Sequence, residues 1–276
     1  MTNQIDISPR KQQFKKEYER LQRVYSELIA KRDNLLMHEG PYLEALYMNT
    51  IGTLQYEVLC LQYEIALLKL ERDLLQAYAN RGEEPEEDVV QEKVRQTAQT
   101  FNEKIHREEE KIQDAKTYIE EHPEEETKEK EDEKIEIKKI YKRLVHRLHP
   151  DLHPDQSEWE RELFLKVQEA YRNEDLERLR QLEKELDAGM PSQLSDSDTI
   201  EDWEERIEKL KTQIAALRAE IKKIEHDFPF TYRKLLHDQE WVSSKQDDLR
   251  AHIEQLRVEK ERLDKIVEVL RNQTNG

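Results

Sequence analysis

The sequence predicts an all-α protein in which long coiled-coil helices flank a small helical domain. Charged residues make up 39% of the 276 residues, hydrophobic residues make up 36%, and only 5 residues are Gly. This composition, combined with helical periodicity, is typical of long helices and coiled coils. Over most of the chain the apolar residues recur at alternating intervals of three and four, which predicts narrow seams instead of one large core.

The first part of the chain, residues 8–121, is predicted to form three antiparallel helices. Ser8 and Pro9 suit the N-cap and the first position of a helix. The sequence EGPY at residues 39–42 is predicted to end that helix. The second helix, from about residue 42 to 80, carries two apolar stripes and is expected to lie between two neighbours. The third carries a thinner seam. We expect this segment to be a scaffold without chemistry of its own.

Two linkers separate the remaining segments. Residues 122–133 are predicted to be an acidic linker, and nine acidic but only two basic side chains lie between residues 120 and 133. A run of like charges is usually solvated. The alternative is an acidic strap that lies against the basic helix following it. Residues 189–199 are predicted to be the second linker.

The C-terminal segment, residues 200–272, is predicted to form an antiparallel coiled-coil hairpin. A seam of threes and fours continues without a break up to residue 224, and DFPF at residues 227–230 turns the chain. A second seam, from residue 249 to 270, returns in the same register. The alternative is a parallel homodimer through either arm.

The charge and the cysteine content exclude several classes of protein. The net charge is −17, whereas nucleic-acid binding needs clustered positive charge to contact phosphates. A single cysteine, Cys60, excludes an internal disulfide framework and a thiolate zinc cluster. The N-terminus lacks the apolar core of a signal peptide, and the longest apolar runs are too short to span a bilayer. We therefore expect a soluble, cytoplasmic protein that binds neither nucleic acid nor membrane.

Residues 134–188 break the heptad pattern and are predicted to form a separate helical domain. The apolar face of its first helix consists of Ile137, Ile140, Tyr141, Leu144 and Leu148. Its opposite face carries Lys138, Lys139, Lys142, Arg143, His146 and Arg147. Pro150 is predicted to end this helix, because the residue before a proline disfavours helical angles. Two further helices are expected at about residues 157–171 and 175–186.

The tripeptide His-Pro-Asp occurs twice in seven residues, at residues 149–151 and 153–155. With His146 the two copies make a trio of histidines, but the two prolines interrupt the helical geometry that would bring them together on a metal ion. Acid–base chemistry would need a nucleophile and a pocket, and a chain of thin helices offers neither. We therefore expect no metal, no cofactor and no enzymatic activity.

The segment EIKKIYKRLVHRLHPDLHPDQSEWERELFLKVQEAY resembles the core of a J domain, the co-chaperone module of the DnaJ family. The family pattern is a basic helix of the form E-I-K-K-x-Y-R-K-L, an H-P-D loop, and a helix that contains F-x-x-I-x-E-A-Y. The resemblance covers residues 136–171. His149 lies eight residues after Tyr141, directly at the end of the basic helix, so the first tripeptide is the matching copy. LHPD at residues 152–155 falls where family members commonly carry KNPD.

The resemblance implies a co-chaperone or adaptor that recruits a DnaK-type ATPase chaperone. In that family the basic helix docks on an acidic ATPase domain, and the H-P-D loop triggers ATP hydrolysis. The docking residues that the resemblance implies are His149, Pro150, Asp151, Lys138, Lys139, Lys142, Arg143, His146 and Arg147. The coiled coils would then select an unknown client or a location. The alternative is a structural coiled-coil assembly protein whose J-like module does not act on a chaperone.

The segment also departs from the family pattern. Family members usually begin with a helix of the Y-x-x-L-G type just upstream, and the acidic run takes that place here. We expect either that the third scaffold helix supplies this packing or that the domain is truncated. The glycine-phenylalanine linker, the cysteine-rich zinc repeats and the client-binding sheet domain of DnaJ are absent from the sequence, so only the J module is shared.

Overall fold

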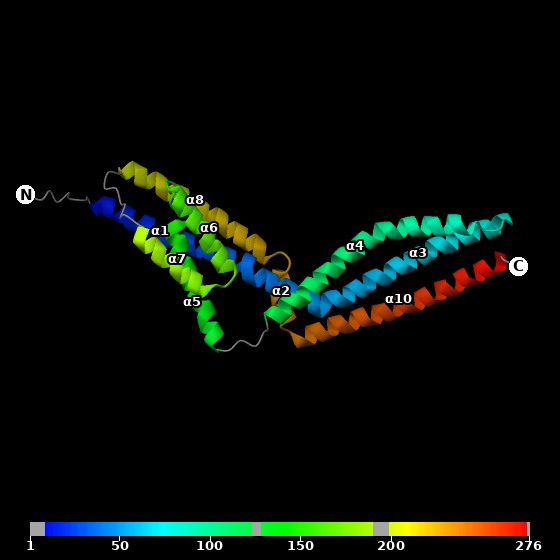
Figure 1. Cartoon of the computed structure of the whole chain (residues 1–276). Helices are drawn as coiled ribbons and strands as arrows, with labels where there is room; N and C mark the ends of the chain where they lie inside the picture. Colours follow the sequence, from blue (N-terminus) through cyan, green and yellow to red (C-terminus); the bar gives the residue numbers. More distant parts are fainter. Residues whose placement is uncertain (1–8, 123–127, 190–198, 275–276) are drawn as a thin grey trace, which may run out of the picture. The chain divides into compact units, whose positions relative to one another are not determined.

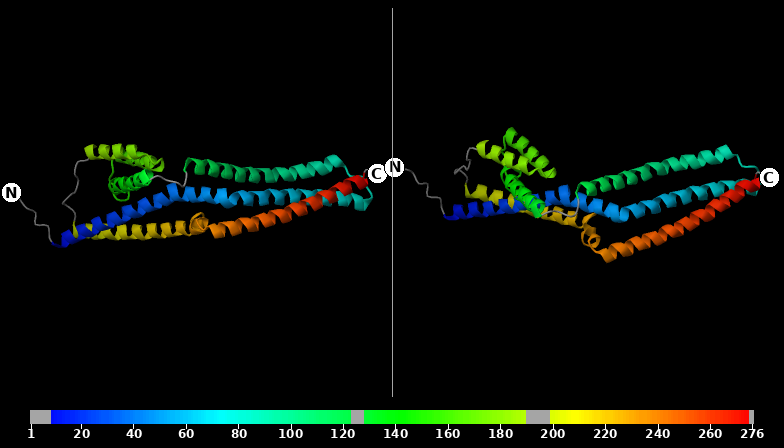
Figure 2. Two further views of the ribbon diagram at one scale, coloured as in Figure 1. Left: turned by 90° about the horizontal axis from the view of Figure 1, so that it is seen from below. Right: turned by 60° about the horizontal axis from the view of Figure 1, so that its bottom comes forward.

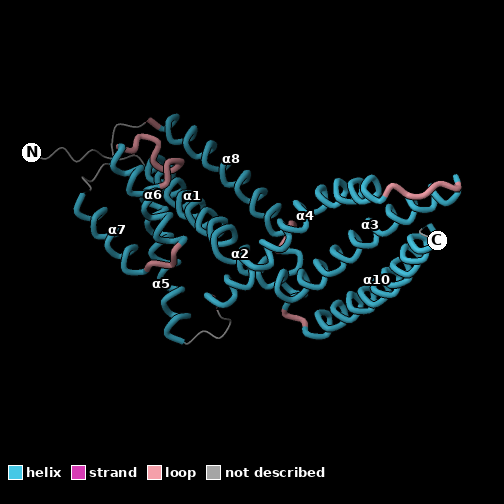
Figure 3. Tube along the Cα trace, turned by 45° about the vertical axis from the view of Figure 1, so that its right-hand side comes forward, coloured by secondary structure: helices cyan, strands magenta, loops and turns pink. Residues whose placement is uncertain are grey.

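The computed structural model describes residues 9–122, 128–189 and 199–274 (Figure 1). Every regular element in these ranges is helical, and the loops between the helices are short (Figure 3). The all-α fold class is therefore confirmed. None of the described helices combines the length and the apolar character needed to cross a lipid bilayer.

The chain forms two compact units, and each combines segments that are far apart in the sequence. The first unit comprises residues 1–41 and 124–230, and the second comprises residues 42–123 and 231–276. The assignment of residues 134–188 as a separately folding domain remains a prediction.

The helix was expected to end at residues 39–42, and this expectation was wrong. The chain stays helical from Pro9 to Arg81. The successive elements are α1 (Pro9–Asn34), the π-helical turn η1 (Leu35–Glu39), α2 (Gly40–Tyr47), a second π-helical turn η2 (Met48–Gly52) and α3 (Thr53–Arg81).

The π-helical turn explains how the helix tolerates Gly40 and Pro41. In an ordinary α-helix the proline ring would clash with the carbonyl four residues earlier, and a π turn widens the backbone at this point. The Gly40 N–H donates to the Leu35 carbonyl, five residues back. A Cβ at residue 40 would lie 2.7 Å from that carbonyl oxygen, so the close approach requires glycine.

In the first unit α1 pairs with α8 (Ile200–Glu225), and the two helices run in the same direction (Figure 1). Ion pairs join Arg10 to Glu204 at 3.3 Å near one end and Lys31 to Glu225 at 2.8 Å near the other. Both pairs join residues 194 positions apart, which is the signature of a parallel register.

In the second unit α10 (Gln239–Thr274) lies along α3, also in parallel. Glu57 pairs with Arg257 at 2.6 Å and Glu64 pairs with Lys260 at 2.8 Å. One apolar cluster between them consists of Leu61, Ile65, Ile253, Leu256 and Leu263. Figure 2 shows both parallel pairs from two further directions.

These pairings correct the predicted C-terminal hairpin over residues 200–272. Its two arms, α8 and α10, are both helical as expected, but each packs against a helix from the N-terminal part of the chain. A heptad seam identifies which face of a helix is buried, and any partner with a matching seam can cover it. The seam pattern therefore predicted the arms correctly and their partner wrongly.

Helix α3 does lie between two neighbours, as its two apolar stripes predict. Its neighbours are α10 and α4 (Glu87–Glu121), whereas α1 was expected in place of α10. Helix α4 returns antiparallel to α3, and the rings of Tyr63 and Phe101 stack with centroids 4.4 Å apart. Gly82, with φ of 67°, caps α3 in the left-handed region before the chain turns.

The predicted acidic linker is partly a helix. Helix α5 (Lys128–Leu148) already includes residues 128–133, and residues 130–133 are exposed at its N-terminal end. Carboxylates near a helix N-terminus are stabilised by the helix dipole, which explains why the acidic run extends the basic helix there. Residues 123–127, and residues 190–198 of the predicted linker 189–199, lie outside the described residues.

Candidate functional site

Three helices and two loops form the framework of the candidate site. They are α5, α6 (Glu158–Arg172) and α7 (Leu176–Gly189), which all contact one another. The predicted apolar face of α5 is buried throughout, with Ile137, Ile140, Tyr141, Leu144 and Leu148 at most 3% exposed. Ser157 begins α6 with a capping box, because its hydroxyl accepts from the Glu160 N–H and the Glu160 carboxylate accepts from the Ser157 N–H.

The first His-Pro-Asp follows the last turn of α5, where Pro150 was predicted to end the helix. The His149 N–H still donates to the Val145 carbonyl at 2.9 Å. The His149 carbonyl accepts from the N–H groups of Leu152 and His153, both at 3.0 Å. The loop is therefore a hydrogen-bonded turn that places Pro150 in solvent.

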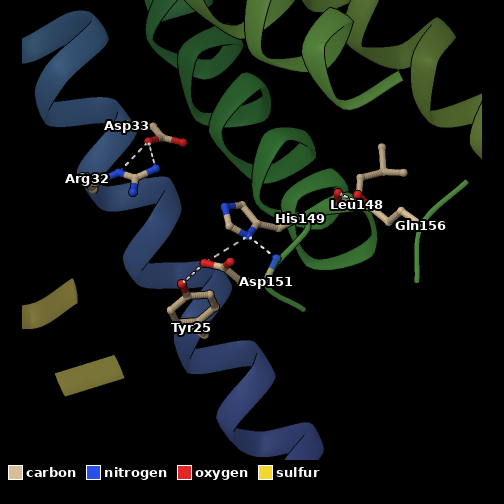
Figure 4. A network of polar contacts seen from close by, with 7 residues as sticks. All are labelled: Tyr25, Arg32, Asp33, Leu148, His149, Asp151 and Gln156. Carbon is tan, nitrogen blue, oxygen red and sulfur yellow. Dashed lines mark hydrogen bonds and ion pairs between the residues drawn. The ribbon is translucent and has the colours of Figure 1, made fainter. Parts of the chain in front are cut away.

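The imidazole of His149 is buried beneath this turn (Figure 4). It packs edge-on against Phe164, with ring centroids 5.4 Å apart, and against Tyr25, with centroids 5.9 Å apart. Its Nδ1 accepts a hydrogen bond from the Asp151 N–H at 3.2 Å. Burial lowers the pKa of His149, against the opposing effect of the Asp151 carboxylate, and this favours the neutral ring.

The carboxylate of Asp151 reaches back towards α1 (Figure 4). The Tyr25 hydroxyl donates to Asp151 Oδ2 at 2.5 Å. Burial and this hydrogen bond to a carboxylate raise the pKa of Tyr25 far above its usual value, so the phenol remains a donor. The Asp151 side chain is nevertheless 46% exposed, which leaves part of the carboxylate open to a partner.

The second His-Pro-Asp has a different environment. The ring Nε2 of His153 lies 2.9 Å from the His146 carbonyl oxygen, within the last turn of α5. The Gln156 side chain donates to the Leu148 carbonyl, and Leu152 is buried between the two copies. Carbonyls at the end of a helix have no partner within the helix. The second copy and Gln156 therefore close the C-terminus of α5.

The basic face of α5 divides into free and paired cations. Lys138 and Lys139 are exposed and form no ion pair with the described residues. Lys142 pairs with Glu27 of α1. Arg143 pairs with Glu183 of α7 at 2.7 Å, and Arg147 pairs with Asp187 of the same helix at 2.6 Å. His146 is half-buried, and burial lowers its pKa. The structure thus places all the predicted docking residues along α5 and its C-terminal loop.

Sequence reasoning missed the contribution of α1. Asp33 is only 2% exposed, and its carboxylate accepts from the Tyr141 hydroxyl at 2.6 Å and pairs with Arg32 at 2.8 Å. The ring of Tyr141 stacks on Tyr171, with centroids 3.7 Å apart, and the Tyr171 hydroxyl donates to Asn34 at 3.4 Å. The one available signal was Arg32, which interrupts an otherwise apolar seam in the sequence.

These contacts answer the question of the missing upstream helix. The third scaffold helix, α4, belongs to the second unit, where it contacts α3 and the turn η2. Helix α1 packs against α5 instead, with Leu21, Tyr25 and Ile29 buried. The helical module is therefore completed by a segment more than a hundred residues upstream.

The fold and the site together define a small helical module with a basic helix, a His-Pro-Asp turn and a following helix. Residues 126–173 match the family model described as the DnaJ domain, which confirms the resemblance over this segment. No curated protein matches the chain, and no solved structure does. The match indicates a co-chaperone role in general, and proteins with this domain generally work with a DnaK-type chaperone and are not themselves enzymes.

Proposed function

We propose that this protein docks on a DnaK-type ATPase chaperone through α5 and the first His-Pro-Asp turn, and that docking stimulates ATP hydrolysis by the chaperone. The observation that carries the proposal is the turn of His149, Pro150 and Asp151. It is held by backbone hydrogen bonds at the end of a basic helix, within the segment that matches the DnaJ domain.

The physical chemistry of the turn supports this role. The buried imidazole and the backbone bonds fix the loop before a partner arrives, so less conformational entropy is lost on docking. The part-exposed Asp151 carboxylate can accept a charge-assisted hydrogen bond from an arginine of the partner. Lys138 and Lys139, exposed and unpaired among the described residues, can steer an acidic partner towards α5.

The test is ATP hydrolysis by a purified DnaK-type chaperone in single-turnover conditions. We expect the protein to stimulate hydrolysis and His149→Gln to abolish the stimulation, because glutamine cannot reproduce the ring that packs between Tyr25 and Phe164. His153→Gln is the matched control in the second copy and should leave most of the stimulation intact. Equal losses from both substitutions would contradict the assignment of the first copy.

The helical pairs outside α5–α7 are the part of the molecule that we propose selects the client or the location. We place this protein in the cytoplasm, and a homodimer formed through its coiled-coil helices is compatible with this role. The competing function is a structural coiled-coil protein. The ion pairs that already occupy Lys142, Arg143 and Arg147 favour that interpretation. It predicts no stimulation of any DnaK-type chaperone.

A further inference from the structure

We propose that α1 is a built-in competitor for the docking face of α5, so that the protein is held masked until a chaperone displaces the side chains of α1. This inference rests on the proposed function and concerns the regulation of the same site. In the free protein α1 occupies the docking face. The ligand with which α1 competes is an acidic protein surface that carries an arginine.

The first observation is that α1 contacts both the His-Pro-Asp turn and the basic face of α5. Tyr25 donates to Asp151 of the His-Pro-Asp turn at 2.5 Å. Two residues further along α1, Glu27 pairs with Lys142 on the basic face. A partner that binds Asp151 Oδ2 or the Lys142 ammonium group must exchange its own groups for these two.

The second observation is that α1 offers the same kinds of group as the partner. A chaperone surface that binds this site needs a donor for the Asp151 carboxylate and carboxylates for the cations of α5. Tyr25 is such a donor and Glu27 is such a carboxylate. Helix α7 continues the pattern, because Glu183 and Asp187 pair with Arg143 and Arg147. The chain therefore pairs Lys142, Arg143 and Arg147 of its own basic face with carboxylates, which are the groups that a chaperone surface would offer.

The third observation is that α1 is anchored independently of these exchangeable contacts. Asp33 is buried against Tyr141 and Arg32, and α1 is also paired with α8. In contrast, the Lys142 and Glu27 side chains are 44% and 54% exposed, and exposed ion pairs contribute little to stability. The ion pair between Lys142 and Glu27 can therefore open while the buried contacts hold the fold. Tyr25 is only 5% exposed, so the exchange there concerns its hydrogen bond to Asp151 and leaves its ring in place.

The strength of the mask follows from population arithmetic. A site that is open in only a fraction of molecules binds with an affinity reduced by that fraction. If the Tyr25 and Glu27 contacts keep the site closed in roughly nine molecules of ten, their removal tightens chaperone binding about tenfold. Stimulation at saturating concentration should stay the same, because the docking residues themselves are unchanged.

The test compares Tyr25→Phe/Glu27→Gln with Tyr18→Phe/Glu17→Gln in the full chain. The second variant carries the same chemical changes on the same helix, but Tyr18 packs edge-on against Trp203 of α8 and Glu17 pairs with Arg20 within α1. The dissociation constant for a purified DnaK-type chaperone with ATP is measured for both variants and the wild type. Thermal unfolding checks that all three proteins are folded.

We expect the first variant to bind roughly five to ten times more tightly than the wild type, and the second to bind like the wild type. Weaker binding of the first variant would show that α1 supports the turn and would overturn the mask, and so would unchanged binding. If neither the wild type nor either variant binds, the proposed function fails, and the mask fails with it.

Discussion

The two copies of His-Pro-Asp are identical in sequence and four residues apart, yet the fold uses them differently. His149 is buried and its neighbour Asp151 is bonded to Tyr25 of a distant helix. His153 is bonded to the helix that has just ended, and Asp155 is exposed. The comparison teaches that a motif acquires its role from the element that precedes it and from the distant residues that surround it.

The largest effect is expected from removing α1, because the first copy then loses the distant residues that distinguish it from the second. A fragment of residues 130–190 lacks Asp33, Asn34 and Tyr25, so the hydroxyls of Tyr141 and Tyr171 lose their partners and the covered face of α5 becomes exposed to water. We expect this fragment to show no cooperative thermal unfolding, as measured by circular dichroism. A sequence-based view of residues 134–188 as an independent domain predicts the opposite result.

A designed protein that joins residues 1–41 to residues 124–230 is the matched control for this fragment. It retains α1 and α8, and we expect a cooperative transition. A cooperative transition of the short fragment alone would show that α1 is not required for folding.

The second largest effect is expected from removing the charge of Asp151, compared with removing the charge of Asp155 in the second copy. Asp151→Asn keeps an oxygen that accepts from Tyr25 but removes the charge that a partner arginine needs. A hydrogen bond to a charged group is worth roughly 2 kcal/mol, so stimulation of a DnaK-type chaperone below saturation should fall more than about tenfold. Asp155→Asn should change it less than about twofold, because Asp155 is exposed and lies outside the docking turn. Equal effects would remove the distinction between the copies.

The pH dependence of stability gives the smallest effect. Burial lowers the pKa of His149 below the usual value of about 6.5. As the pH falls through that value, the unfolded chain takes up a proton that the folded protein does not, so the free energy of unfolding decreases. The stability that depends on a neutral His149 is therefore fully present at a pH above the usual pKa. It is lost as the pH falls towards the lowered pKa of His149.

Urea unfolding at pH 7.5 and at pH 5.5 measures this contribution. His149→Gln should make the loss of stability between the two pH values smaller, because glutamine takes up no proton in either the folded or the unfolded chain. His38 and His146 should maintain part of the dependence, because burial lowers their pKa values too. An unchanged difference between the two pH values would show that His149 is charged in the folded protein.

The local structure of the candidate site was predictable from the sequence. Pro150 ends α5, Ser157 caps α6, and the three- and four-residue spacing identifies the buried face of α5, because each of these effects acts within a few residues. The same spacing identified the two apolar stripes of α3. The resemblance over residues 136–171 added the expected role of the first His-Pro-Asp.

Only the tertiary structure decided which helices pair and what surrounds the turn. A heptad seam shows which face of a helix is apolar, but it does not identify the helix that covers that face. For this reason α8 and α10 were predicted to pair with each other, whereas in the structure α8 packs on α1 and α10 packs on α3. In the sequence Gly40 and Pro41 predict the end of a helix, but in the structure a π-helical turn accommodates them and the helix continues. Tyr25 and Asp33 join the site only because folding brings them next to Asp151 and Tyr141, more than a hundred residues away. Such contacts depend on the packing of whole helices, and no local pattern in the sequence encodes them.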